Sequence, residues 1–423
     1  MKKLFYLVLA VVLLGACSAK NTAELGGGEY GKSDPTATSD YAEAGGDGGI
    51  VAPGEGGEGS EGGEVVPGNE QGEAGRVTAG EWNDLNNWLL WSNLMTNQQA
   101  DQEGSDFTMY SSYWGFYTNH LVAVRVSDSE GKPVLDAPVE LVASESGTVL
   151  YRARTDNKGE AALWIGLTQE QSSVDEAGLA LVVNGAKQAQ AVTVTDWGEE
   201  LTWNELTAAG TSGGKRIDIA FIVDATGSMS DEISFLQADL TNIISTVQSK
   251  HNDADIRTAA LFYRDEGDEY VTRVNDFTDK LSQTTDFIKK QCADGGGDYP
   301  EAVHTALVSG LQELSWREDQ TIRLAFMLLD APPHKQDDVI KKLQDFVPQY
   351  AKSGIRIIPV AASGVDKPTE FFLRFIALAT DGTYVFITNH SGIGNDHIAA
   401  TVGDYKVELL NELMIRLVDQ YLQ

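Results

Sequence analysis

Oxygen-bearing side chains follow an apolar, strand-like run near the middle of the chain. Residues 216–224 read Arg-Ile-Asp-Ile-Ala-Phe-Ile-Val-Asp, and Asp224 is followed by Thr226 and Ser228 at alternate positions. A continuous apolar run is typical of a buried parallel strand, and open α/β sheets bind ligands at the carboxyl ends of their strands. Because carboxylate and hydroxyl oxygens are ligands of hard divalent cations, these three residues predict one loop of a cation site.

Two further loops carry residues of the same chemistry. Gly295-Gly-Gly-Asp298-Tyr-Pro-Glu301 precedes an expected helix, and Asp330 ends a second apolar run that continues as Ala-Pro-Pro-His334. Glycine lets backbone approach an ion closely, and helix starts supply uncommitted N–H groups. We therefore expect three loops to meet at one edge of a sheet. We interpret Glu301 as an acid of the first helical turn, where the helix dipole favours negative charge.

The elements that would position these loops lie in residues 214–423. Apolar runs predict strands at 216–224, 255–264, 270–277, 322–330, 355–361 and 383–388. Amphipathic periodicity predicts helices near 229–250, 281–291, 300–314, 336–352 and 368–379, and from about 405 to the end. Alternating strands and helices predict an α/β domain with a doubly wound, mostly parallel sheet. The short link before 270 allows one antiparallel pair.

Four segments of different composition precede this domain. Residues 1–17 have the pattern of a signal peptide, and residues 18–77 are rich in glycine and glutamate, which predicts a disordered, self-repelling linker. Residues 78–105 predict an amphipathic, tryptophan-rich helix that docks on another surface. Short alternating strands separated by turns predict a β-sandwich over 106–205, similar to prealbumin-like or immunoglobulin-like modules.

The first residues predict lipidation. Lys2 and Lys3 precede an apolar core that is too short to span a membrane, and the core ends in Leu14-Gly-Ala-Cys17. This pattern resembles a bacterial lipobox, which implies cleavage before Cys17 and attachment of lipid to it. We expect a lipid-anchored protein of the bacterial envelope, at the outer membrane or cell surface. An ordinary signal peptide is the alternative. With Cys17 acylated, Cys292 would be a lone thiol.

The charge of the chain limits the classes of partner. Its formal net charge is -32, so we expect no nucleic-acid partner, because phosphates would repel it. The same charge argues against electrostatic attachment to an anionic membrane surface. It is compatible with divalent cations and with protein partners.

The three ordered loop motifs resemble a von Willebrand factor type A (VWA) domain over 214–423. Asp224-Ala-Thr226-Gly-Ser228 is similar to the Asp-x-Ser-x-Ser motif of that family, and Asp330 matches its third-loop aspartate. Asp298 lies where many members have a metal-binding threonine. The glycine-rich and Asp-Ala-Pro-Pro-His motifs are similar to those of bacterial and α-kinase-linked members. Together with the lipobox, they indicate a VWA-containing bacterial lipoprotein.

The resemblance implies a metal-ion-dependent adhesion site. Ser228 and Thr226 would bind Mg²⁺ through hydroxyls, and Asp224 and Asp330 would bind directly or through water. An acidic group of a partner or solvent would fill the remaining position. If Asp298 binds the ion directly, it favours Ca²⁺ or Mn²⁺ and weakens the attraction of the ion for an acidic ligand of a partner. If Asp298 only holds a water, the behaviour of the family is retained.

These observations predict a lipid-anchored, extracytoplasmic protein-binding or adhesion module that is not an enzyme. Arg264, Asp265 and His334 lie near the expected site and are candidate contacts for a partner. For Arg264 and Asp265, a structural ion pair is the alternative. One alternative is an envelope assembly scaffold with a structural metal. Another is a Mg²⁺-dependent hydrolase or phosphotransferase, which would need an acid/base aspartate where Thr226 stands.

Overall fold

The computed structural model describes residues 73–96, 107–211, 213–394 and 396–423. Residues from Gln71 onward form one compact unit. The predicted signal peptide, Cys17 and the predicted linker as far as residue 72 lie outside the described residues. Cys292 carries no free thiol, which differs from the expectation of a lone thiol at that position. No helix in the described ranges has the length and apolar character needed to cross a membrane.

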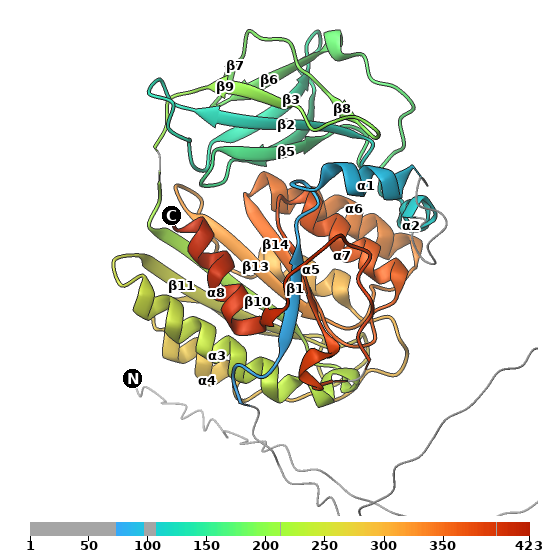
Figure 1. The fold of residues 1–423 in the computed structure, drawn as a ribbon, viewed down its shortest axis with the longest axis vertical. Helices are drawn as coiled ribbons and strands as arrows, with labels where there is room; N and C mark the ends of the chain where they lie inside the picture. The colour runs from blue at the N-terminus through green and yellow to red at the C-terminus, as the bar shows by residue number, and fades with distance from the viewer. Residues whose placement is uncertain (1–72, 97–106, 212, 395) are drawn as a thin grey trace, which may run out of the picture. The chain divides into compact units, whose positions relative to one another are not determined.

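An eight-stranded mixed sheet carries the three loops (Figure 1). Its strand order is β12-β11-β10-β13-β14-β15-β1-β16. The central strands β11, β10, β13, β14 and β15 are parallel, whereas β12 and β1 pair antiparallel with their neighbours. This arrangement confirms the α/β class and the antiparallel pair. The bounds are β10 (Arg216–Asp224), β11 (Asp255–Tyr263), β12 (Thr272–Thr278), β13 (Ile322–Leu329), β14 (Ile355–Ala361), β15 (Tyr384–Ile387), β1 (Thr78–Trp82) and β16 (Glu408–Leu409).

Helices pack on both faces of this sheet because its strands are apolar on both sides. Along β10, Ile219 and Phe221 belong to one buried cluster and Ile222 belongs to another. The first cluster includes residues of α3 (Ile233–Lys250), α4 (Leu281–Ile288) and α8 (Leu410–Tyr421). The second includes residues of α5 (Val303–Gln312), α6 (Asp337–Lys352) and α7 (Lys367–Ala379). The buried sheet thus presents the carboxyl end of β10 at a fixed edge.

Residues 78–105 differ from the predicted single helix. Thr78–Trp82 form β1, which lies in the sheet between β15 and β16 (Figure 1, blue). The buried side chain of Ala79 packs in the same cluster as α8. Pairing in the sheet and this packing therefore stabilise the strand conformation more than an isolated helix would be stabilised. The helical part is α1 (Trp88–Met95), in which Trp88 and Trp91 are buried. The sheet of the C-terminal domain therefore begins before the β-rich region.

Two four-stranded sheets follow α2 (Phe107–Trp114), which occupies the start of the range predicted to be a sandwich. One sheet has the order β5-β2-β8 with β9 also paired to β2, and the other has the order β4-β3-β6-β7. Their apolar side chains share one buried cluster. Asp136, before β3, forms a buried ion pair with Arg323 of β13 at 2.8 Å. The bounds are β2 (His120–Ser127), β3 (Pro138–Ala143), β4 (Val149–Arg154), β5 (Glu160–Trp164), β6 (Leu179–Val183), β7 (Ala186–Lys187), β8 (Thr195–Asp196) and β9 (Trp203–Thr207).

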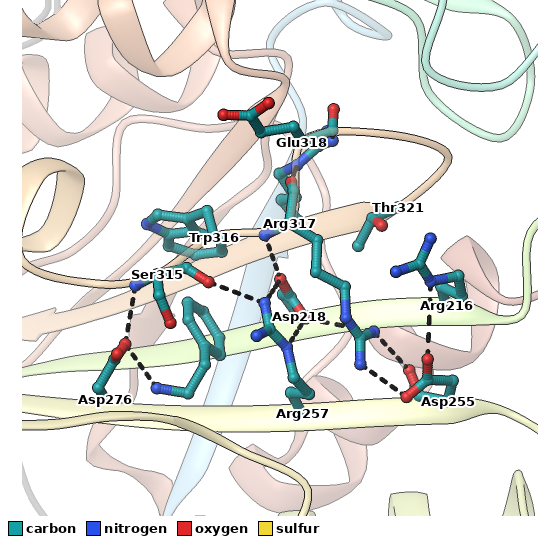
Figure 2. Close-up of polar contacts among 12 residues, drawn as sticks. Arg216, Asp218, Asp255, Arg257, Asp276, Ser315, Trp316, Arg317, Glu318 and Thr321 are labelled. Carbon is teal, nitrogen blue, oxygen red and sulfur yellow. Dashed lines mark hydrogen bonds and ion pairs between the residues drawn. The ribbon is translucent and has the colours of Figure 1, made fainter.

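A buried polar network fixes the end of the central strands that lies away from the three loops (Figure 2). Asp218 of β10 is fully buried and accepts hydrogen bonds from Arg257 Nε at 3.0 Å and Nη2 at 2.6 Å. The Arg317 backbone N–H also donates to Asp218, at 2.9 Å. A buried carboxylate is tolerated when it is paired and hydrogen-bonded in this way. Because Asp218 and Arg257 are register partners on β10 and β11, the network fixes the alignment of those strands.

Candidate metal centre

The first loop brings a carboxylate and two hydroxyls together at the carboxyl end of β10. Asp224 Oδ1 accepts hydrogen bonds from the Thr226 backbone N–H at 2.9 Å and from the Thr226 hydroxyl at 2.7 Å. The hydroxyl oxygens of Thr226 and Ser228 lie 3.2 Å apart. Asp224 and Thr226 are fully buried, whereas Ser228 is exposed. The loop therefore offers buried oxygens beneath an accessible hydroxyl.

The glycine-rich second loop is held against the first loop by backbone hydrogen bonds. The Gly227 N–H donates to the Gly295 carbonyl at 3.1 Å, and the Asp294 N–H donates to the Ala225 carbonyl at 3.0 Å. Gly295 and Gly296 have φ values of 81° and 74°, in the left-handed region that residues with a Cβ enter at a cost. Consecutive glycines thus allow the second loop to lie directly on the first.

Asp330 and Glu301 bring two more carboxyl groups to the same place. Asp330 follows β13, is buried, and lines the same cavity as Ser228. Glu301 is only 3% exposed. Its interpretation as an acid of the first helical turn is wrong, because α5 begins at Val303 and has no acid in that turn. The Glu301 N–H instead donates to the Pro332 carbonyl of the third loop at 2.9 Å.

These buried carboxyl groups lie in a region of negative charge. Burial raises the pKa of Asp224, and burial followed by the charge of Asp224 raises the pKa of Asp330. Burial and then the charges of Asp224 and three other aspartates raise the pKa of Glu301 to about 9. One oxygen of each group, Asp224 Oδ2, Asp330 Oδ1 and Glu301 Oε2, is buried and accepts no hydrogen bond. Since buried anions need compensating charge, a bound cation would stabilise all three.

An open cavity of about 280 Å³ lies beside two of these groups, Glu301 and Asp330. Ser228, Glu301 and Asp330 line it, and so does Asp298, which is exposed. Across the described ranges, no three His, Cys, Asp or Glu side chains converge closely enough to hold a metal by themselves. An ion in this cavity would therefore also need the hydroxyls of the first loop. Carboxylate and hydroxyl oxygens with room for water suit Mg²⁺ or Ca²⁺, so the residues present fit such an ion.

A larger cavity of about 670 Å³ lies elsewhere in the same unit. Residues of β1 and α8, and of the turn between β4 and β5, line it. None of the three loop motifs contributes to it. We therefore assign the candidate function to the smaller cavity, which residues of all three loop motifs line.

Arg264, Asp265 and His334 make contacts within the protein. Arg264 is 2% exposed and donates to the carbonyls of Ala225 at 3.1 Å and Cys292 at 2.9 Å. The prediction that Arg264 contacts a partner is wrong, because its guanidinium is buried and ties the first loop to the segment before the second. His334 Nε2 lies 2.7 Å from Asp265 Oδ1. For that pair, contact with a partner stays a prediction.

Comparisons with known proteins agree with this geometry. Residues 218–365 match the family model of the von Willebrand factor A domain. The chain is 33% identical over 122 residues to an ariadne-like RING finger protein of Acanthamoeba polyphaga mimivirus, which covers 29% of this chain and 12% of that protein. It is 25% identical over 185 residues to an alpha-protein kinase of Dictyostelium discoideum, which covers 43% of this chain and 28% of that protein. The chain thus spans less than a third of either relative.

A solved structure was also found to be similar. The crystal structure of the conserved hypothetical protein BatB from Bacteroides thetaiotaomicron has a TM-score of 0.35 and 10% identity, and it covers 48% of this chain and 98% of that chain.

The family match, the sheet and the three loops agree on the class of domain that residues 218–365 form. The chain contains a von Willebrand factor A domain, whose motifs lie within residues 218–365. Domains of this class generally mediate protein–protein interactions. The match ends before α7, β15 and α8, which the structure includes in the same compact unit.

Proposed function

We propose that this chain is a protein-binding or adhesion module that uses a divalent cation held by Asp224, Thr226, Ser228 and Asp330. The observation that supports the proposal is the set of buried, unsatisfied oxygens of Asp224, Glu301 and Asp330, of which the last two line an open cavity together with the exposed Ser228. Mg²⁺ suits this oxygen set, and Ca²⁺ or Mn²⁺ are the alternatives. Asp298, at the rim, is placed to reach the ion or one of its waters.

The ion would supply positive charge and open coordination positions, and the chain would supply the rest. Asp224 and Thr226 are buried at the end of β10. Arg264 donates hydrogen bonds to the carbonyls of Ala225 and Cys292, which ties the first loop to the segment before the second loop. Ser228 lies on the open side, where an acidic side chain of a partner protein or solvent would complete the ion's ligands. The side chains on the surface around the ion would then determine the specificity for the partner.

The predicted lipobox at Cys17 supports a location in the bacterial envelope. Under this proposal, lipid on Cys17 anchors the protein, and the glycine- and glutamate-rich segment separates the VWA domain from the membrane. Radiolabelled palmitate incorporation in the native host, compared between the parent and Cys17→Ser, tests the anchor. Equal labelling of both proteins would contradict it.

An assembly scaffold with a structural metal is the second candidate function. The buried ion pair between Asp136 and Arg323 favours it, because it fixes the β-rich region to the VWA sheet. In that case the ion would hold three loops together without touching a partner. Catalysis as a Mg²⁺-dependent hydrolase or phosphotransferase has less support, because buried Thr226 stands where an acid/base carboxylate is required.

Metal binding is tested first with the whole protein. Isothermal titration with Mg²⁺, Ca²⁺ and Mn²⁺ should give one site in the parent and none in Asp224→Ala. Asp286→Ala, an exposed residue of α4, is the matched control and should bind as the parent does. Failure of the parent to bind any of the three ions would overturn the proposal.

Partner capture then separates the adhesion module from the scaffold. The parent, Asp224→Ala and Asp286→Ala are used as baits on envelope extract, with and without EDTA. A protein that binds the parent and Asp286→Ala, but is lost with EDTA or Asp224→Ala, supports the adhesion module. Partners that bind all three baits equally in EDTA would favour the scaffold.

A further inference from the structure

Glu301 is fixed between the second and third loops. Its backbone N–H donates to the Pro332 carbonyl at 2.9 Å, and it forms a parallel β-bridge with Pro333. These contacts hold the backbone before α5 begins, so the side chain is free of the helix. The carboxyl group is buried and lines the cavity together with Ser228 and Asp330.

The Glu301 carboxyl also lies close to the first loop. A Cβ atom built on Gly296 would be 3.0 Å from Glu301 Oε1 and 3.4 Å from Thr226 Cβ. The carboxyl group and the Thr226 side chain therefore both lie next to the space that a side chain at residue 296 would occupy. Glycine at this position leaves that space free for them.

Among the described residues, one oxygen of this buried acid has no hydrogen-bond partner. Glu301 Oε2 is buried without a hydrogen-bond partner, and the residue is 97% removed from solvent, with 3% of its surface exposed. The charges that act most strongly on it are those of Asp224, Asp265, Asp330 and Asp268, which are all negative. A carboxyl group in such surroundings needs a proton or a cation.

We propose that Glu301 is an internal carboxylate ligand of the metal centre and fills a position that an acidic partner or solvent would otherwise occupy. This inference rests on the proposed metal-dependent function. Among the described residues no three carboxyl groups converge on one point, so Glu301 and Asp330 would face the ion from the cavity with Ser228, and Asp224 would act through the Thr226 hydroxyl that donates to it. It is the buried acid of the second loop, whereas Asp298 is exposed.

An internal carboxylate changes the chemistry of the partner. Asp224, Asp330 and Glu301 carry three negative charges when all are ionised, so one dication near them leaves the centre with a net negative charge. A partner's carboxylate is then repelled, and neutral or basic side chains are the groups that this face recognises. A third carboxylate also favours Ca²⁺, which accepts more oxygen ligands at more flexible distances than Mg²⁺.

Glu301→Gln tests the inference because it removes the charge and keeps the size of the side chain. Titration of the full chain with Ca²⁺ alone should show affinity at least tenfold weaker in Glu301→Gln than in the parent. Asp298→Asn changes the exposed acid of the same loop and should weaken binding less than threefold, on the order of a solvent-screened charge. Glu313→Gln, at the exposed end of α5, controls for net charge.

Bound Mn²⁺ gives a second measurement that reports on coordination. Water-proton relaxation should increase in the Glu301→Ala complex relative to the parent complex, because water takes the position that the carboxylate leaves. Equal Ca²⁺ affinity and equal relaxation in the variants and the parent, with binding lost in Asp224→Ala, would overturn the role of Glu301 and leave the metal centre standing. Absence of binding in the parent would instead remove the proposed function itself.

Discussion

Removing the charge of Glu301 should stabilise the metal-free protein. Burial and four neighbouring aspartates raise the pKa of this carboxyl from 4.5 to about 9. Because the folded-state pKa lies above the unfolded-state value, the protonated carboxyl contributes its full stability below pH 4.5. That contribution is lost progressively as the pH rises towards the folded-state pKa. At about pH 7 the folded protein must keep a proton that the unfolded chain has released.

The size of the effect follows from the same values. The interval between the unfolded pKa and pH 7 is about 2.5 pH units, and each unit corresponds to about 1.36 kcal/mol. The metal-free parent at pH 7 should therefore be about 3 kcal/mol less stable than it would be with a permanently neutral group at this position. Glu301→Gln supplies such a group, with nearly the same shape as the protonated acid.

Urea unfolding in EDTA measures this difference. At about pH 7, Glu301→Gln should unfold at higher urea than the parent by up to about 3 kcal/mol in unfolding free energy, and the gap should close at about pH 4.5. With saturating Ca²⁺ the order should reverse, because the parent gains more from the ion. Glu313→Gln should follow the parent throughout. A Glu301→Gln protein that is less stable than the parent in EDTA at every pH would refute the electrostatic reasoning.

Three further substitutions test other parts of the structure. Asp218→Asn removes the charge of a buried network and should cost about 3 to 5 kcal/mol of unfolding free energy; a loss near zero in urea unfolding would show that the network does not anchor the strands. Gly296 has φ 74°, and an added Cβ would lie 3.0 Å from a carboxylate oxygen. Gly296→Ala should therefore cost about 1 to 2 kcal/mol of unfolding free energy and weaken Ca²⁺ binding in titration. Gly185→Ala, at φ 76° with open space around it, should lower stability and leave Ca²⁺ binding unchanged. Asp136→Asn leaves Arg323 buried without its anionic partner and should make the β-rich region more sensitive to limited proteolysis than the VWA sheet; unchanged digestion of both would contradict a stabilising role.

Much of the C-terminal domain could be predicted because its local signals agree with its packing. The strand predicted at 216–224 has the same bounds as β10, and the helix predicted at 336–352 differs from α6 by one residue at its start. Both segments are long and strongly patterned. The link between β11 and β12 is too short for a helical crossover, so it indicated the antiparallel pair that the structure contains.

Other features depend on contacts that are distant in sequence. Thr78–Trp82 has no periodicity of its own that favours a strand, and its strand conformation comes from pairing with β15, about 300 residues away. Glu301 follows Tyr299-Pro300, and the sequence predicts that it belongs to the first turn of the helix. Only the bridge to Pro333 separates it from α5 and directs its carboxyl group to the cavity. The burial of Arg264 likewise depends on two loops that the sequence does not show to be adjacent.

The position of β1 determines how this protein can be divided into fragments. A fragment that begins at residue 214 contains every loop of the candidate metal centre but lacks the strand that pairs with Tyr384–Ile387. The backbone N–H and C=O groups of β15 would then form an open edge beside exposed apolar side chains of α8, and an edge of this kind pairs with other chains. Such a fragment should aggregate on expression, so that the VWA domain becomes soluble only when residues from about 73 onward are included.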